Sequence, residues 1–121
     1  MADHRRSLGQ AAETAAAAFL ARAGLQVLER NVRFALGEID IVCRDRDTLV
    51  FVEVKCRQAR WGDDPATAVS WPKQRRLGQL AALYLKSRGL VDVRCRFDVV
   101  TVTVDDTDGR IRHIPGAFDL S

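Results

Sequence analysis

Residues 38–57, EIDIVCRDRDTLVFVEVKCR, contain two runs rich in isoleucine and valine that flank a short polar segment. Runs of this composition are typical of β-strands, and the polar segment between them predicts a β-hairpin. With the loop centred on Arg46 and Asp47, Arg44 lies opposite Leu49, and each further pair follows by counting outward.

The predicted register divides the side chains of this hairpin between two faces. On one face, Asp40 stands directly opposite Glu53, and Glu38 stands opposite Lys55. The other face is wholly apolar, with Ile39, Ile41 and Cys43 against Val54, Val52 and Val50. The hairpin is therefore expected to bury one face in the core and to carry charges on the other.

The facing carboxylates of Asp40 and Glu53 suggest a cation site. Two like charges ~5 Å apart repel by about 3 kcal/mol at an effective dielectric of ~20. A divalent ion such as Mg²⁺ relieves that repulsion and completes its shell with water and phosphate oxygens. Lys55 beside them can orient or help deprotonate an attacking water and offset charge that builds on a phosphate.

A simpler interpretation of the charged face stays open. Asp, Glu and Lys on a half-exposed strand are often only solvated, and a Glu–Lys cross-strand pair needs no function. The apolar neighbours Leu49 and Phe51 weigh against it, because a strand with such neighbours seldom carries two charges on that face.

The rest of the chain predicts further elements around the hairpin. We expect a helix over residues 7–23, a strand over 25–34, the hairpin 38–57, a helix over 71–88, a long strand over 91–104 and a short edge strand over 111–114. The buried helical stripes are expected to be Ala12, Ala16, Phe19, Leu20 and Ala23 in the first helix, and Leu77, Leu80, Ala81 and Tyr84 in the second. Three consecutive strands between two helices predict an α/β fold, a mixed sheet flanked by helices in one domain over residues 1–121.

Composition narrows the class of protein. The chain is 47% hydrophobic and 29% charged with a net charge of +3, and it has no apolar run of the ~20 residues that a membrane span requires. The polar start of the chain does not resemble a secretory signal, so a cytoplasmic protein is expected. Cys43, Cys56 and Cys95 stand singly in apolar runs and are interpreted as small core residues.

The hairpin also resembles a known family. Residues 37–42, GEIDIV, and 49–57, LVFVEVKCR, look like the signature of the YraN-type family of uncharacterised bacterial proteins. That family is similar to the PD-(D/E)xK nuclease superfamily with its αβββαβ restriction-endonuclease-like core, which includes archaeal Holliday-junction resolvases. Outside the hairpin the resemblance extends to Gly9, Glu13, Asn31, Arg33, the run 73–76 and the run 96–100.

The resemblance implies roles for individual residues. It makes Asp40 and Glu53 ligands of Mg²⁺ or Mn²⁺, the carbonyl of Val54 a further ligand and Lys55 the catalytic lysine. Glu13 resembles a first-helix acid that assists metal binding, although it equally could only flank the apolar stripe of its helix. Glu38 is interpreted as the partner of Lys55 in preference to a third acid at the metal.

The implied activity is that of a metal-dependent nuclease that hydrolyses phosphodiester bonds in DNA, including branched or repair intermediates. Ile39 stands where the superfamily motif has proline, a departure that divergent members share. The alternative is a non-catalytic nucleic-acid-binding or adaptor domain that keeps a vestigial site. A homodimer and a helicase or repair partner are compatible with either function.

Basic residues near the second helix are candidates for nucleic-acid binding. Arg57, Arg60, Lys73, Arg75 and Arg76 could contact phosphates without reading sequence, or could form a solvated helix face. Gln74, at the start of that helix, resembles a polar residue that lies beside the site in some relatives, and it is counted among the nucleic-acid-binding candidates on that ground. Trp61 and Trp71 could stack on unpaired bases, but for Trp71 buried packing is expected. Asp98 is expected to bind a neighbouring arginine, and no role is assigned to His4 or His113.

Overall fold

A computed structural model describes residues 4–57, 69–103 and 110–119. Its elements in chain order are α1 (His4–Arg22), β1 (Gln26–Phe34), β2 (Gly37–Asp45), β3 (Thr48–Arg57), α2 (Trp71–Ser87), β4 (Arg94–Thr103) and β5 (Ile111–Phe118). The predicted α/β class, a mixed sheet flanked by helices, is confirmed, and each predicted helix and strand has a counterpart.

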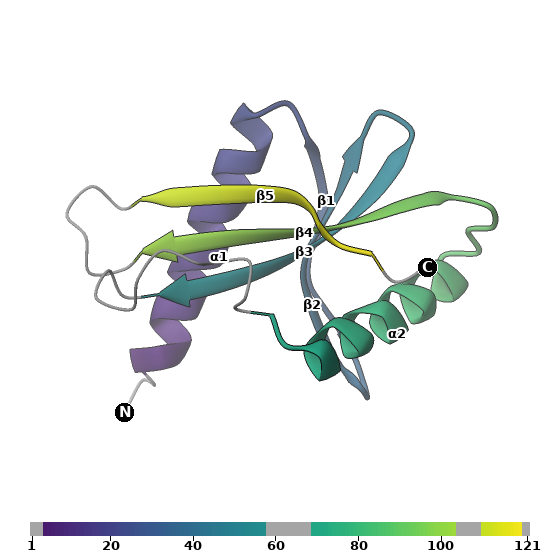
Figure 1. Ribbon diagram of the computed structural model, residues 1–121, viewed down its shortest axis with the longest axis horizontal. Helices are drawn as coiled ribbons and strands as arrows, with labels where there is room; N and C mark the ends of the chain where they lie inside the picture. Colours follow the sequence, from purple (N-terminus) through teal and green to yellow (C-terminus); the bar gives the residue numbers. More distant parts are fainter. Residues whose placement is uncertain (1–3, 58–68, 104–109, 120–121) are drawn as a thin grey trace.

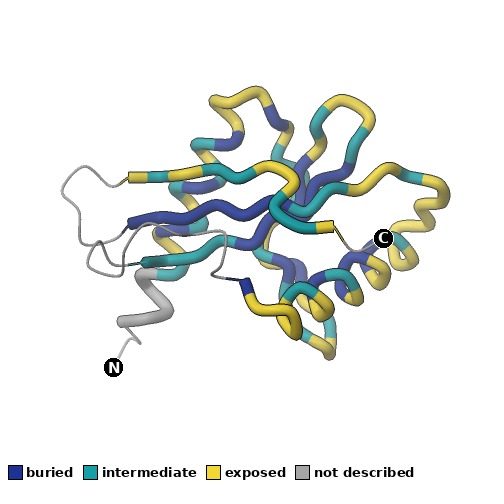
Figure 2. Tube along the Cα trace, viewed as in Figure 1, coloured by how far each residue is buried: buried dark blue, intermediate teal, exposed yellow. Residues whose placement is uncertain are grey.

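The five strands form one sheet in the order β1-β2-β3-β4-β5 (Figure 1). All neighbours are antiparallel except β3 and β4, which run parallel because the α2 connection separates them in sequence. Alternate residues of β3 belong to different core clusters: Val50 and Val52 pack with α1, whereas Leu49 and Phe51 pack with α2. The two helices therefore cover opposite faces of the sheet, and the centre of β3 is buried on both faces (Figure 2).

Helix α1 packs on the sheet through small side chains. Ala12, Ala16 and Leu20 repeat at four-residue spacing and are buried, as predicted. Phe19 is only half-buried and Ala23 is exposed, so the predicted stripe was too wide. Ala23 is exposed because the helix ends at Arg22 and the chain turns at Gly24, whose φ is +100°.

Helix α2 begins and ends as its sequence predicts. Ser70 caps it by accepting a hydrogen bond from the Lys73 amide, and Pro72 occupies its first turn. All four predicted stripe residues are buried: Leu77, Leu80, Ala81 and Tyr84. The Tyr84 ring packs edge-on against Phe51, with centroids 5.6 Å apart, which fixes α2 against the centre of β3.

The Tyr84 hydroxyl ties α2 to β1. It donates a 2.6 Å hydrogen bond to the Glu29 carboxylate, which also binds Arg88. Burial, followed by the bond to Glu29, raises the pKa of Tyr84 to about 12, so the hydroxyl stays protonated and donates at neutral pH.

Tyr84→Phe is expected to lower the free energy of unfolding by about 1 kcal/mol, because it removes that hydrogen bond and leaves the ring in place. Urea titration of Tyr84→Phe, Glu29→Gln and the double variant measures the coupling between the two groups. Strictly additive effects would show that the bond contributes nothing to stability.

Three predicted details differ in the structure. Strand β4 begins at Arg94 and not at 91, because Asp92 has a φ of +58° that breaks the extended backbone. Strand β5 continues to Phe118, past a bulge beside Gly116, and is longer than the predicted 111–114. Of the cysteines only Cys43 is buried, whereas Cys56 is half-buried and Cys95 is exposed.

Neither helix, within the part of the chain that the structure describes, is long and apolar enough to cross a membrane.

Candidate metal centre

The β2–β3 hairpin has the predicted register only near its loop. Arg44 pairs with Leu49 and Ile41 with Val52, and Arg46 takes a φ of +58° in the turn. Within the described strands the β2–β3 ladder ends at Ile41 and Val52, so the predicted backbone pairs Asp40–Glu53 and Glu38–Lys55 are wrong.

The Asp40 side chain accounts for the end of that ladder. Its carboxylate accepts a 2.8 Å hydrogen bond from the amide of Val54, a donor that would otherwise face the backbone of β2. The strands part at this point, and β2 changes direction. Ile39 consequently lies in the α2 cluster while Ile41 lies in the α1 cluster, although their spacing predicted a shared face.

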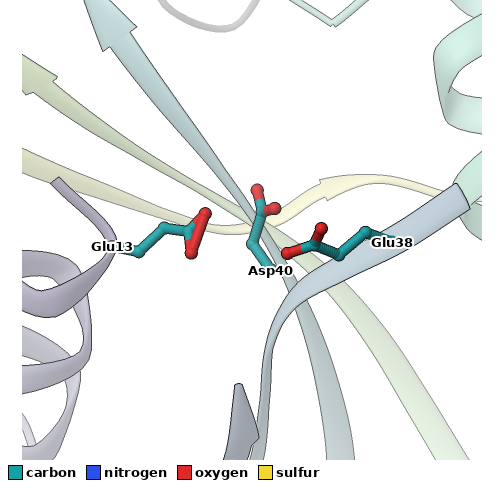
Figure 3. A group of neighbouring side chains, drawn as sticks. All are labelled: Glu13, Glu38 and Asp40. Carbon is teal, nitrogen blue, oxygen red and sulfur yellow. The ribbon is translucent and has the colours of Figure 1, made fainter. Parts of the chain in front are cut away.

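Three carboxylates meet where β2 leaves β3. Glu13 on α1 and Glu38 and Asp40 on β2 each offer an oxygen within 4.8 Å of the others, and Figure 3 shows the three groups turned toward one another. Each of these residues is partly exposed, so the cluster is reachable from solvent. The structure thus brings Glu13 and Asp40, both predicted site residues, close together, and the role of Glu13 in metal binding stays a prediction.

Asn31 on β1 holds the cluster from outside. Its side-chain amide donates to the Glu13 carboxylate and, at 2.7 Å, to that of Glu38. The residue has a φ of +53°, a conformation that asparagine tolerates better than most side chains. The Glu38 carboxylate also lies 3.4 Å from Arg33 Nε, so its ion-pair partner is Arg33, and the expected pairing with Lys55 is wrong.

Asp40 is the most perturbed acid of the cluster. Burial, and next the negative charge of Glu53, raise its pKa to about 7, with further contributions from Glu13 and Glu38, while the Val54 amide acts in the opposite direction. Burial and the neighbouring carboxylates thus both disfavour the ionised form of Asp40.

Glu53 lies beside the cluster and faces α2. It is buried, and one of its carboxylate oxygens lies 2.9 Å from the ammonium of Lys73. The negative charge of Glu53 raises the pKa of Asp40, so the structure brings the two predicted ligands Asp40 and Glu53 near each other. The converging oxygens, however, belong to Glu13, Glu38 and Asp40, and Glu53 is not among them. Lys55 is half-buried on the same strand face, and burial, with the charge of Lys73, lowers its pKa.

The predicted phosphate-binding residues fall into two groups. Lys73 and Arg76 are exposed on α2 near the site, and Arg57 is half-buried at the end of β3. Gln74 instead donates a 3.0 Å hydrogen bond to the carbonyl of Val69, which gives it a structural partner. Arg60 and Trp61 lie outside the described residues. Trp71 is 61% exposed, so the expectation that it is buried is wrong.

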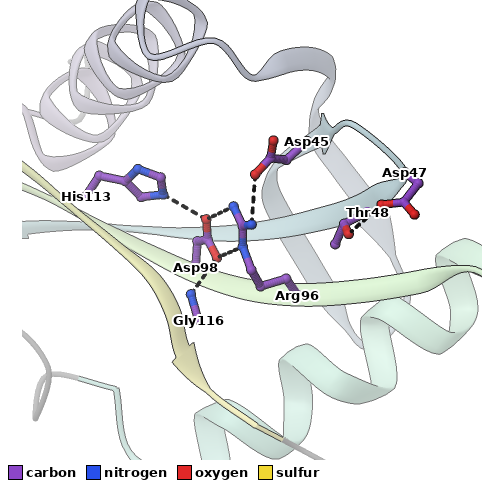
Figure 4. A network of polar contacts seen from close by, with 7 residues as sticks. All are labelled: Asp45, Asp47, Thr48, Arg96, Asp98, His113 and Gly116. Carbon is purple, nitrogen blue, oxygen red and sulfur yellow. Dashed lines mark hydrogen bonds and ion pairs between the residues drawn. The ribbon is translucent and has the colours of Figure 1, made fainter.

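A second polar network lies around Asp98, which is fully buried (Figure 4). Its carboxylate accepts two hydrogen bonds from Arg96, at 2.9 and 3.0 Å, and one from the Gly116 amide, and it contacts His113 Nε2 at 2.7 Å. The predicted bond between Asp98 and an arginine is confirmed, and Arg96 also binds Asp45. With every oxygen partnered, this network ties β4 to β2 and β5.

Sequence reasoning gave no role to Asn31 or His113. Asn31 could have been noticed because it interrupts a predicted strand. Asparagine adopts a left-handed backbone conformation more often than most residues do, so it can indicate a local change in the strand. His113 had no such signal, because its partner Asp98 is 15 residues away in sequence.

Comparison with known proteins shows close relatives along nearly the whole chain. The model of a family described as "Uncharacterised protein family UPF0102" matches residues 12–102. A UPF0102 protein of Symbiobacterium thermophilum is 50% identical over 107 residues, which cover 88% of this chain and 90% of that protein. One from Desulforapulum autotrophicum is 48% identical over 98% of both chains, and one from Geobacter metallireducens is 42% identical over 100% of this chain and 99% of the relative.

Proposed function

This chain belongs to the uncharacterised protein family UPF0102, and we propose that it is a metal-dependent nuclease that hydrolyses phosphodiester bonds in DNA, branched or repair intermediates among them. The observation that carries the proposal is the convergence of Glu13, Glu38 and Asp40, with Glu53 close enough to raise the pKa of Asp40. Glu13, Glu38 and Asp40 come from one helix and one strand, and Glu53 approaches them from β3.

The donor set fits a hard divalent cation. The converging atoms are carboxylate oxygens, with no sulfur or imidazole among them, which is the ligand type of Mg²⁺ and Mn²⁺. Glu13, Glu38 and Asp40 would hold the ion, and by the resemblance Glu53 and the Val54 carbonyl would complete its protein ligands. When bound, such an ion lowers the pKa of a water molecule and offsets the charge of a phosphate.

The residues of the chain supply the rest of the chemistry. Lys55, whose pKa is lowered, can exchange a proton with water more readily than an ordinary lysine and can donate to a phosphate oxygen. Lys73 holds Glu53 in place from α2, and the exposed Arg76 on the same helix can bind phosphates of the backbone. Asn31 orients Glu13 and Glu38 by donating to both.

One observation favours a second function, that of a non-catalytic nucleic-acid-binding or adaptor domain. Glu53 is already paired with Lys73 and Glu38 with Arg33, so part of the negative charge is balanced without a metal. In such a domain the acids would shape a surface, and substitution of Lys55 would leave nucleic-acid binding unchanged.

A cleavage assay separates the two functions. Linear, flapped and four-way DNA substrates are incubated with the protein in Mg²⁺, Mn²⁺ or EDTA, and we expect metal-dependent cleavage of at least one of them. Lys55→Met should reduce the rate about 100-fold, because the donor to the phosphate is lost. Lys86→Met makes the same change at an exposed lysine at the far end of α2 and should cleave like the wild type. Equal rates for Lys55→Met and wild type would exclude the role given to Lys55.

A further inference from the structure

A groove runs between α2 and the adjoining strands β4 and β5, on the face of the sheet that α2 only partly covers. It has a volume of about 1000 Å³, at the upper end of the range for small-molecule sites. Its lining includes Trp71, Arg75 and Ala82 from α2, Phe97 from β4 and Phe118 from β5. No role in the acidic cluster involves any of these residues.

Aromatic rings form the apolar part of this groove. Phe97 and Phe118 stack with centroids 5.3 Å apart and an interplanar angle of 16°, and Phe97 stacks in turn on the buried Phe51. Trp71, at the first position of α2, is 61% exposed and contacts no other ring among the described residues. A large exposed indole beside a fixed ring stack offers flat surfaces at which a planar ligand can pack.

One basic side chain of the groove, Arg75, is available to an anionic ligand. Arg75 is exposed and has no polar partner in the parts of the chain that the structure describes. Arg96, on the opposite wall, is held by Asp45 and Asp98. Arg96 is therefore taken up by its own carboxylate partners, Asp119 adds an acidic group to the lining, and Arg75 is the cation of the described lining that is left to bind an anion.

We propose that this groove binds an unpaired stretch of nucleic acid, with bases stacked on Trp71 and on Phe118, the ring at the end of the stack, and a phosphate on Arg75. Aromatic faces combined with cations are the usual means of holding single strands without sequence preference. The proposal rests on the proposed nuclease function and gives its substrate a single-stranded segment. Lys73, two residues from Trp71, binds Glu53, so the same end of α2 borders both the groove and the acidic cluster.

Two neighbouring positions on α2 give a matched test. Ala82 and Leu83 are both exposed, but of the two only Ala82 lines the groove. Ala82→Glu places a carboxylate in the groove, whereas Leu83→Glu places the same group outside it. Binding of a fluorescein-labelled 15-residue oligothymidylate, and of a duplex of equal length, is measured by fluorescence anisotropy in EDTA.

We expect Ala82→Glu and Trp71→Ala to weaken oligothymidylate binding about tenfold or more, while Leu83→Glu binds like the wild type and duplex binding changes less than about twofold. Circular dichroism checks that each variant is folded. Wild-type affinity for oligothymidylate in folded Ala82→Glu and Trp71→Ala would overturn the proposal. Sedimentation gives a second test of the proposal. If the only effect of Ala82→Glu is to convert a dimer to a monomer, the occupant of the groove is a second copy of this chain and the proposal is overturned.

The two proposals fail separately. Binding is measured in EDTA and therefore does not depend on cleavage. Single-strand binding in the groove, together with no cleavage of any DNA in Mg²⁺, would exclude only the proposed hydrolysis. Conversely, metal-dependent cleavage together with groove variants that bind normally would exclude only the groove.

Discussion

Asp40→Asn is expected to reduce DNA cleavage about 100- to 1000-fold and, at the same time, to stabilise the metal-free protein at pH 8. The loss of activity is expected because Asp40 belongs to the acidic cluster, and its charge would be needed to hold the proposed cation. The amide keeps an oxygen that can accept the Val54 hydrogen bond, so the local backbone is preserved.

The gain in stability follows from the sign of the pKa shift. The pKa of Asp40 is raised by burial and by Glu53 from 3.8 to about 7, so the folded state retains a proton that the unfolded state releases. Ionised Asp40 therefore costs stability, and this cost grows as the pH rises from about 4 to about 7. Asn removes the charge and hence the cost.

Thermal unfolding in EDTA at pH 5 and pH 8 measures this effect. The melting temperature of Asp40→Asn should exceed that of the wild type at pH 8, and the two should differ less at pH 5. If the acids hold the proposed cation, added Mn²⁺ should raise the melting temperature of the wild type but not of the variant, which lacks one of the ligands. Asp47→Asn, which neutralises an exposed loop carboxylate, serves as the matched control. A lower melting temperature for Asp40→Asn at pH 8 would contradict the assigned electrostatics.

Asp98→Asn is expected to lower the free energy of unfolding by about 3 kcal/mol. Asp98 is fully buried, and its loss leaves the charge of the half-buried Arg96 without its main partner. Asp45→Asn removes the more exposed partner of the same arginine and should cost less than about 1 kcal/mol. Urea midpoints of both variants measure the difference, and equal losses would show that burial of Asp98 does not set the strength of the network.

The pH dependence provides a second check on Asp98. Burial alone would raise its pKa, but hydrogen bonds from His113, Arg96 and the Gly116 amide hold it below the ordinary value of 3.8. A lowered pKa means that the contribution to stability is complete above that ordinary value and is lost as the pH falls through the folded-state pKa. The wild type should therefore lose stability more steeply than Asp98→Asn as the pH falls below 4.

Much of the fold could be predicted because it depends on neighbours in sequence. The alternation of Ile and Val with polar residues, the Ser70 cap and the stripe from Leu77 to Tyr84 each lie within one element. Their periodicity reports which face is buried, whatever the rest of the chain does. For the same reason the hairpin register was right from Arg44–Leu49 to Ile41–Val52, where the loop controls the pairing.

The sequence by itself determined the element order, the hairpin and the presence of acids near Asp40, because these follow from local periodicity and turn chemistry. Only the tertiary structure decided which acids meet. The Asp40 side chain takes the Val54 amide and parts the strands, and Asn31 gathers Glu13 from α1 and Glu38 from β2. These hydrogen bonds join residues far apart in sequence, and the exposure of Trp71 depends on how α2 packs on the sheet, so neither leaves a periodic signal along the chain.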